Sequence, residues 1–340
     1  MDKENQYLRQ YPDLMAGKKI MYVHGFGSSA QSGTVTMLQT LLPNATVIAE
    51  DLPIHPDEAM QMLRTMQQDE QPALIIGTSM GGMYTELLYG FDRILVNPAF
   101  QMAQTMKEHG MTGKQTWQNP RQDGETEFMV TKALEKEYKE LTDQCFVELE
   151  AMDEEQKKEE QSRVWGLFGD EDPVVHTFDL YRSHYPQAAH FHGEHRMDDK
   201  SFLNGVVPVI RWIDDQQEGR ERPIVYIDFS ALVDGYGKPK ASLVKAYRML
   251  IENYQVYIVA TAPTNDHQHL ADAAAWVEQY LSTPAHDHVI YANQKALLYG
   301  DYFIDMLPDD NFMGTGIQLG SDEFKTWDEI ITYFERLGGQ

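Results

Sequence analysis

One short segment, Gly77-Thr78-Ser79-Met80-Gly81-Gly82, constrains the fold of this chain more than any other. It directly follows the apolar run Ala73–Ile76 and precedes a stretch of helical propensity that begins near Met83. A strand, a Gly-x-Ser-x-Gly turn and a helix in this order predict a nucleophile elbow, a strained turn that exposes Ser79 above the end of a sheet. Glycine is needed on both sides because a Cβ there would clash with the neighbouring strand or helix. The pentapeptide alone is a weak pattern, so the prediction depends on whether the downstream residues supply an acid and a base.

An acid and a base come after the serine in the order that an α/β-hydrolase requires. The apolar run Val164–Phe168 predicts a buried strand, and the loop after it carries Asp170 and Asp172. A carboxylate in that loop could orient an imidazole. The run Ala188–Phe191 predicts a last short strand, and the loop after it reaches His195. This order predicts an α/β-hydrolase fold with Ser79, an aspartate and a histidine as its catalytic residues.

The acid and the base each have competitors nearby. Asp172 is favoured over Asp170 because it stands directly before the Pro-Val-Val that would begin the next helix, whereas Asp170 is typical of a turn cap. His190 and His192 share one face of the predicted strand, where a structural or surface role is expected. His195 is therefore favoured as the base.

The oxyanion hole is predicted at a loop upstream of the elbow. The run Lys19–Val23 reads as a strand that continues into His24-Gly25-Phe26-Gly27. Backbone N–H groups of Phe26 and of Met80, the residue after the nucleophile, would stabilise the negative charge of a tetrahedral intermediate.

Taken together, these motifs and several others resemble the YqiA-type esterases, small bacterial α/β-hydrolases that act on carboxylic esters and acyl thioesters. The further motifs are Ser28-Ser29, Ser32, Asp51-Leu52-Pro53, Tyr84 and Val96-Asn97-Pro98-Ala99. The resemblance covers about Lys19 to Ile213 and implies Ser79 as nucleophile, Asp172 as acid and His195 as base. Where the family has Gly-Asn-His at the base, this chain has Gly193-Glu194-His195.

Composition narrows the classes of partner. The formal charge of −25 argues against nucleic acid and anionic membrane surfaces. A single cysteine, Cys145, excludes a disulfide framework and a cysteine-rich zinc site. No apolar stretch approaches the length of a membrane span, and the N-terminal residues lack the apolar core of a signal peptide. We therefore expect a cytoplasmic enzyme whose partner is a small-molecule ester and whose esterase site needs no cofactor; the oligomeric state stays open.

The segment 101–161 predicts a helical insertion that forms a cap over the active site. No convincing strand is expected between Phe100 and Arg163, and much of the segment is charged and helical in propensity. Its methionines suggest an adaptable apolar lining, although they fit ordinary core packing as well. They are Met102, Met106, Met111 and Met129. The alternative is a solvated helical arm with no part in substrate selection.

A polar run, Asp214–Pro223, predicts a linker between two domains, residues 1–217 and 218–340. After it the alternation of strands restarts, as expected for a second, smaller α/β domain of Rossmann-like arrangement. The predicted strand ends of this domain carry Asp228, Thr261, Lys295 and Asp305. Ligands of open α/β sheets bind at this edge.

This second constellation resembles the haloacid dehalogenase-type phosphatases, most closely the 5′(3′)-deoxyribonucleotidases, from about Ile224 to Leu337. The resemblance implies Asp228 as the nucleophile toward phosphorus, Thr261 and Lys295 as phosphate ligands, and Asp305 with Asp228 as Mg²⁺ ligands. Ser230 stands where the family has its acid/base aspartate, and Met306 replaces a carboxylate of the metal motif. Losing acid/base help costs about 10²–10⁴-fold in rate, so a degenerate module appended to an esterase is expected. The alternative is a nucleotide phosphatase or nucleotide-binding protein.

Overall fold

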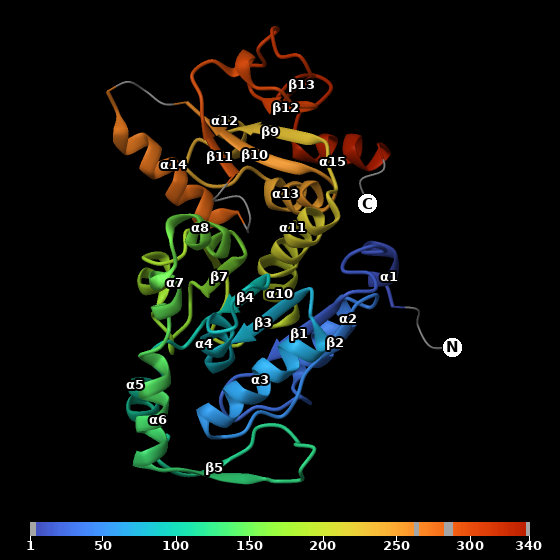
Figure 1. Cartoon of the computed structure of the whole chain (residues 1–340). Coiled ribbons are helices and arrows are strands. Elements are labelled where there is room, and N and C mark those ends of the chain that lie inside the picture. The colour runs from blue at the N-terminus through green and yellow to red at the C-terminus, as the bar shows by residue number, and fades with distance from the viewer. Residues whose placement is uncertain (1–4, 262–264, 282–287, 338–340) are drawn as a thin grey trace. The chain divides into compact units, whose positions relative to one another are not determined.

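The chain forms two units, each built around its own parallel sheet (Figure 1). This computed structural model describes residues 5–261, 265–281 and 288–337. Contacts between Cα atoms divide the chain into residues 1–203 and 204–340. The two-domain α/β architecture expected from the sequence is confirmed.

Six parallel strands form the sheet of the first unit in the order β2-β1-β3-β4-β7-β8. They are β1 (Lys19–Val23), β2 (Thr46–Ile48), β3 (Leu74–Thr78), β4 (Arg93–Val96), β7 (Val164–Gly169) and β8 (Ala188–Phe191). The central strands are apolar almost throughout because helices cover both faces of such a sheet. Since the strands are parallel, the segments that follow β1, β3, β7 and β8 meet at one edge. This is the α/β-hydrolase fold that the sequence predicts.

Helix α1 (Tyr7–Gln10) precedes the first strand. The helices that connect these strands are α2 (Gly33–Leu41), α3 (Pro56–Glu70), α4 (Met80–Glu86) and α9 (Phe178–Arg182), and α10 (Asp199–Gly205) crosses the division between the units. In α3 a proline opens the helix and two acidic residues occupy its first turn, both of which favour an N-terminus. Its buried residues Ala59, Met60 and Leu63 recur at helical spacing, so one face packs into the core.

Five parallel strands form the sheet of the second unit, in the order β11-β10-β9-β12-β13. They are β9 (Ile224–Asp228), β10 (Gln255–Ala260), β11 (Val289–Tyr291), β12 (Tyr302–Asp305) and β13 (Thr315–Gln318). The helices are α11 (Val207–Glu218), α12 (Phe229–Leu232), α13 (Leu243–Asn253), α14 (His267–Tyr280) and α15 (Trp327–Arg336), with a 3-10 turn at Lys295–Leu297. Among the described residues, no helix has the length and apolar character needed to cross a membrane.

The expected linker is largely wrong. Asp214 to Glu218 belong to helix α11, and Asp214 is fully buried and paired with Arg220. A polar run can be a helix when ion pairs satisfy its charges, and composition alone does not reveal those pairs. The compact units divide before α11, and the domain boundary after residue 217 stays a prediction.

The insertion of the first unit contains a hairpin as well as helices. Its elements are α5 (Met102–Glu108), β5 (Gly113–Thr116), β6 (Glu127–Val130), α6 (Lys132–Thr142), α7 (Val147–Ala151) and α8 (Glu154–Ser162). The expectation that the segment has no strand is wrong, because β5 and β6 pair antiparallel. Both strands are four residues long; β5 is polar, and the apolar part of β6 is only the three residues Phe128–Val130, so neither gives a clear strand pattern in the sequence.

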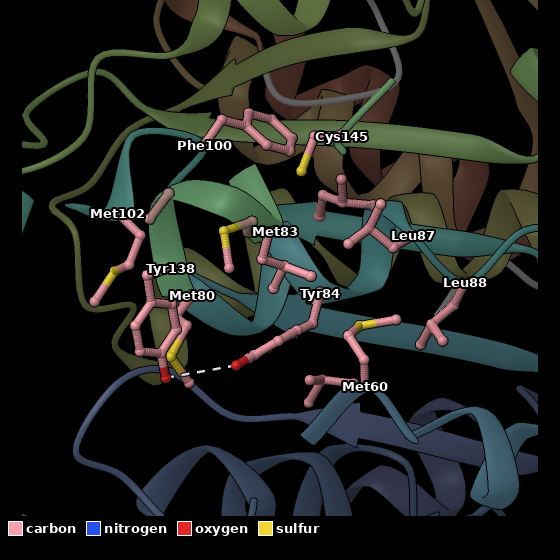
Figure 2. Packing of buried hydrophobic residues seen from close by; sticks show 14 of the residues in the cluster. Met60, Met80, Met83, Tyr84, Leu87, Leu88, Phe100, Met102, Tyr138 and Cys145 are labelled. Atoms are coloured by element: carbon pink, nitrogen blue, oxygen red, sulfur yellow. Dashed lines mark hydrogen bonds between the residues drawn. The ribbon is translucent and has the colours of Figure 1, made fainter. Parts of the chain in front are cut away.

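The insertion shares the core of the first unit, which excludes the solvated arm. Tyr138 of α6 is fully buried and its hydroxyl donates to the carbonyl of Ile54 at 3.0 Å. Figure 2 shows Tyr138, Met102 and Cys145 packed with Met83 and Tyr84 of helix α4. Of the four methionines, Met102 and Met106 are buried, Met111 is partly buried and Met129 is exposed. The insertion therefore packs directly onto the helix that follows Ser79.

A buried ion pair fixes the end of the insertion to the sheet. Arg93 of β4 is fully buried and is paired with Glu160 of α8, whose carboxylate also accepts from the N–H of Gly90. The Arg93 guanidinium also donates to the carbonyls of Thr85 and Glu86. Removing one partner of such a pair leaves an uncompensated charge in the interior.

We predict that Glu160→Gln lowers the free energy of unfolding of the first unit by about 3 kcal/mol, because the buried Arg93 loses the carboxylate that it is directly paired with. Urea denaturation measures this quantity. Glu159→Gln is the matched control: Glu159 pairs with Arg163 on the surface, and its loss should cost under about 0.5 kcal/mol. Equal effects of the two substitutions would contradict the role assigned to the buried pair.

Candidate active site

Ser79 lies in the sharp turn between β3 and α4. Its φ of 56° and ψ of −121° are strained for a residue with a side chain. A Cβ on Gly81 would lie 2.0 Å from the carbonyl oxygen of Val23, and one on Gly77 would lie 2.2 Å from the hydroxyl oxygen of Thr85. Both glycines are therefore required for β1, β3 and α4 to approach one another. The local geometry is that of a nucleophile elbow.

Ser79, His195 and Asp172 form one continuous chain of hydrogen bonds. His195 Nε2 lies 3.0 Å from Ser79 Oγ, and its Nδ1 lies 2.8 Å from Asp172 Oδ2. The other carboxylate oxygen of Asp172 accepts from the N–H groups of Val174 and Val175. Burial raises the pKa of Asp172, but the hydrogen bonds from His195 and these two N–H groups outweigh it and hold the pKa below its usual value. An ionised Asp172 keeps the imidazole proton on Nδ1, so Nε2 is free to accept the serine proton.

The other candidates for the acid and the base, Asp170, His190 and His192, contact other residues and not Ser79. Asp170 accepts from the N–H of Gly193 at 3.0 Å and lies 3.2 Å from Nδ1 of His192, whose ring is exposed. His190 stacks on Phe178 with ring centroids 4.1 Å apart. The two loops thus carry two carboxylate–imidazole pairs, and only the Asp172–His195 pair reaches Ser79.

Asn97 holds the histidine loop in place, a role that the sequence alone did not indicate. Its side-chain amide donates to the carbonyls of Glu194 and His195 and accepts from the N–H of Gly169. One side chain thereby joins the ends of β4 and β7 to the loop after β8. The available signal was its position in Val96-Asn97-Pro98-Ala99, directly after a buried strand. The Glu194 side chain is exposed.

The loop after β1 lies against the serine. A Cβ on Gly25 would lie 3.4 Å from Cβ of Ser79. Within the described residues, the backbone N–H groups of Phe26 and Met80 take no part in the hydrogen bonds of the turns or of helix α4. Two uncommitted donors beside the nucleophile fit the predicted oxyanion hole, and that assignment stays a prediction.

His24 anchors this loop from below. Its Nε2 accepts from the N–H of Leu52 at 3.1 Å, so its proton is on Nδ1, which lies 2.9 Å from the carbonyl oxygen of Gly25. Burial lowers the pKa of His24 to about 4. The side chain is therefore neutral near pH 7, and its hydrogen bonds to Leu52 and Gly25 hold the loop that carries Phe26.

Four of the second unit's predicted site residues come together at the carboxyl edge of its sheet. Lys295 Nζ lies 2.6 Å from a carboxylate oxygen of Asp228 and 2.6 Å from one of Asp305. The Ser230 hydroxyl donates to the other oxygen of Asp228 at 2.6 Å. Burial lowers the pKa of Lys295, but its hydrogen bonds to the two aspartates outweigh this and raise the pKa. Thr261 follows β10 at the same edge and is exposed.

The residues at this edge do not fit a divalent cation. Both oxygens of Asp228 are engaged by Ser230 and Lys295, and those of Asp305 by Lys295 and the N–H of Leu307. The adjacent position is Met306, a weak ligand for Mg²⁺. In the described part of the chain, no group of three or more His, Cys, Asp or Glu side chains is arranged to hold a metal. The Mg²⁺ site implied by the resemblance is therefore not supported by the donor set.

The second unit also contains a cavity of about 290 Å³ at the opposite, amino-terminal ends of its strands. Arg220 and Arg222 line it, and both are paired with Asp215. None of the site residues predicted from the sequence lines this cavity.

Comparison with known proteins identifies the first unit. Residues 19–193 match the model of an uncharacterised protein family, UPF0227. The chain belongs to this family. The resemblance to the YqiA-type esterases is thereby confirmed.

A second relative is a protein of Vibrio phage KVP40 named as a 5′(3′)-deoxyribonucleotidase. It is 31% identical over 137 residues, which are 39% of this chain and 76% of the phage protein. The resemblance to the deoxyribonucleotidases is therefore also confirmed.

Solved structures of similar fold include a monoacylglycerol lipase of Paleococcus ferrophilus, with a TM-score of 0.38, 14% identity and coverage of 58% of this chain and 94% of that one. Mouse alpha/beta hydrolase domain-containing protein 10 gives a TM-score of 0.39 and 15% identity, covering 59% and 90%. Est1E of Butyrivibrio proteoclasticus gives 0.39 and 12%, covering 60% and 90%. Similarity at this level says nothing about activity.

We predict that His24 makes the first unit sensitive to mild acid. The unfolded chain binds a proton at the ordinary pKa of 6.5 and the folded chain only near 4, so the unfolded state gains protons first and stability falls between these values. Lowering the pH from 7 to 5 should cost about 2 kcal/mol through this group. Urea denaturation at both pH values measures the loss.

His24→Gln is the comparison variant, because glutamine still offers an acceptor toward Leu52 but does not titrate. It should lose about 2 kcal/mol less than the unmodified chain over the same pH interval. If both chains lose the same amount, His24 is not the group responsible.

Proposed function

We propose that this chain is a serine hydrolase that cleaves carboxylic esters, and by the same chemistry acyl thioesters, at Ser79. The observation that carries the proposal is the unbroken relay from Ser79 through His195 to the buried Asp172. A serine hydroxyl is a weak nucleophile unless a positioned base removes its proton. This relay places such a base 3.0 Å away and fixes its tautomer from the other side.

Acylation would begin when Ser79 Oγ attacks the ester carbonyl carbon and His195 Nε2 takes the hydroxyl proton. The C=O electron pair moves onto oxygen, and the N–H groups of Phe26 and Met80 would stabilise that charge. Each such donor is worth about 10²–10³-fold in kcat. Collapse of the tetrahedral intermediate breaks the bond to the leaving alkoxide or thiolate, which takes the proton from His195.

Deacylation would repeat the sequence with water in place of the serine. His195 Nε2 takes a proton from water, the resulting hydroxide attacks the acyl carbon, and Ser79 leaves with the proton that His195 returns. Asp172 stays ionised throughout and stabilises the imidazolium that forms in each half-reaction.

The insertion is the proposed selector of the acyl group. Phe128 of β6 and Tyr138 of α6 lie edge-on to Phe26, with ring centroids 5.3 Å and 6.0 Å apart. Two side chains of the insertion therefore flank the loop that would hold the substrate carbonyl. Phe128 is only partly buried, and its apolar aromatic surface at this place favours an uncharged acyl chain.

For the second unit we propose a degenerate phosphatase-like module with little or no activity. The phage relative supports an ancestry among nucleotidases, but Ser230 cannot protonate a leaving alkoxide near neutral pH as a carboxylic acid can. Its hydroxyl is also committed to Asp228. Compartment and partners of the whole chain stay predictions.

The proposed ester hydrolysis predicts distinct effects for the two aspartates of one loop. With p-nitrophenyl butyrate, Ser79→Ala should lower kcat by about 10⁴-fold or more. Asp172→Asn should lower it by about 10⁴-fold, because the His195 proton is no longer held on Nδ1. Asp170→Asn should stay within about tenfold of the unmodified chain, since Asp170 pairs with His192 and not with the relay. Circular dichroism checks that each variant is folded.

A large loss in Asp170→Asn with little change in Asp172→Asn would transfer the acid role to Asp170. Retention of most activity in folded Ser79→Ala would refute the nucleophile.

The degenerate module predicts that restoring two carboxylates restores chemistry. The unmodified chain should hydrolyse deoxynucleoside monophosphates near background, and Ser230→Asp with Met306→Asp should raise the rate about 100-fold in the presence of Mg²⁺. Release of inorganic phosphate measures both rates, and Asp228→Asn added to the double variant is the control that should remove the gain. Turnover of about 1 s⁻¹ or faster by the unmodified chain would show a competent phosphatase instead.

A further inference from the structure

The loop of the insertion hairpin is hydrogen-bonded to the loop that carries Phe26. Residues 117–126 connect β5 to β6. The N–H of Gln118 donates to the carbonyl of Gly27 at 2.7 Å, and the Asn119 side chain donates to the hydroxyl of Ser28 at 3.1 Å. The hydroxyl of Ser29 in turn donates to the carbonyl of Pro120 at 2.6 Å. Three consecutive residues of each loop are thus joined.

A carboxylate strengthens this junction from the side. Asp51 accepts from the N–H of Ala30 at 2.8 Å with one oxygen and from the N–H of Gln122 at 2.6 Å with the other. The Arg121 guanidinium packs over the ring of Trp117 at 4.2 Å and donates to the carbonyl of Leu52. The hairpin loop is therefore also held by residues 51 and 52, and these contacts fix its position relative to residues 27–30.

Gln118 also reaches the loop that carries the base. Its side-chain carbonyl accepts from Nη2 of Arg196 at 2.6 Å, and Arg196 directly follows His195. On its other side the Gln118 amide lies against Gly27, where an added Cβ would be 3.4 Å from Gln118 Nε2. One residue of the insertion is thus in contact with both loops that would hold reacting groups.

We propose that Gln118 is a positioning residue that fixes the distance between the oxyanion donor Phe26 and the base His195. This inference rests on the proposed ester hydrolysis at Ser79. Oxyanion donors act only within about 2.7–3.1 Å of the developing charge, and a displacement of about 1 Å can cost about 100-fold. Gln118 acts through Gly27 on one side and through Arg196 on the other. The hairpin is therefore part of the scaffold for the chemistry and not only a cover.

The test compares Gln118→Ala, Gln118→Glu and Arg196→Ala with the unmodified chain, using p-nitrophenyl acetate. Gln118→Ala keeps its backbone N–H but loses the acceptor for Arg196, so kcat should fall about 10- to 100-fold while KM changes less than about threefold. Gln118→Glu keeps an acceptor and should stay within about threefold of the unmodified kcat. Arg196→Ala should reproduce the loss, and the double variant should lose no more than either single one, because both changes break the same contact.

Gln115→Ala is the matched control. Gln115 lies in β5 of the same hairpin, and its side chain donates to the carbonyl of Met111, away from the oxyanion loop. It should leave kcat unchanged, and thermal melting checks that every variant is folded.

Unchanged kcat in Gln118→Ala, losses that add in the double variant, or an equal loss in Gln115→Ala would each overturn the positioning role while leaving ester hydrolysis intact. An unmodified chain that does not hydrolyse the ester at all would instead overturn the proposed function, and the positioning role with it.

Discussion

The strained backbone of Ser79 is the constraint on which the rest of the first unit depends. A residue with positive φ at the end of β3 points its side chain above the sheet, and it persists only where the surroundings leave no alternative. Here the surroundings are the carbonyl of Val23 and the first turn of α4, which meet with no room for a Cβ at Gly81. The close approach of β1, β3 and α4 thus has one consequence: it exposes the hydroxyl of Ser79.

The other groups reach that hydroxyl from loops that must be held separately. Asn97 ties the histidine loop to β4 and β7, His24 supports the loop that carries Phe26, and Gln118 contacts both loops. The side chains of Asn97 and His24 bond to backbone groups, whereas the Gln118 side chain bonds to the Arg196 guanidinium and its backbone N–H to Gly27. Such contacts fix a loop without needing it to bury apolar surface, which suits segments at an open sheet edge. The insertion is held differently, because Tyr138 is buried in the core beside Tyr84 (Figure 2).

The sheet and the relay residues were predictable because each follows a distinct apolar strand, and strand order decides where loops meet. Asp172 and Asp170 were harder to separate, since both lie in one loop and both pair with a histidine. Burial and the distance to Ser79 distinguish the two pairs in the structure. The hairpin was not predictable from Gly113–Thr116, which has no apolar alternation and is a strand only through pairing with β6. The linker prediction at Asp214 was wrong for a related reason. Its polarity suggested an exposed loop, but pairing with Arg220, six residues away, allows it to be buried in helix α11.

The central claim is that Ser79 is an activated nucleophile, and covalent labelling tests it most directly. The chain is treated with a fluorophosphonate, digested, and its peptides are analysed by mass spectrometry. We predict one phosphonyl adduct on the peptide that contains Ser79, formed far faster than in Asp172→Asn, and no adduct at Ser230. Absence of labelling at Ser79 in the folded chain, or labelling at the same rate when Asp172 is replaced, would contradict the account.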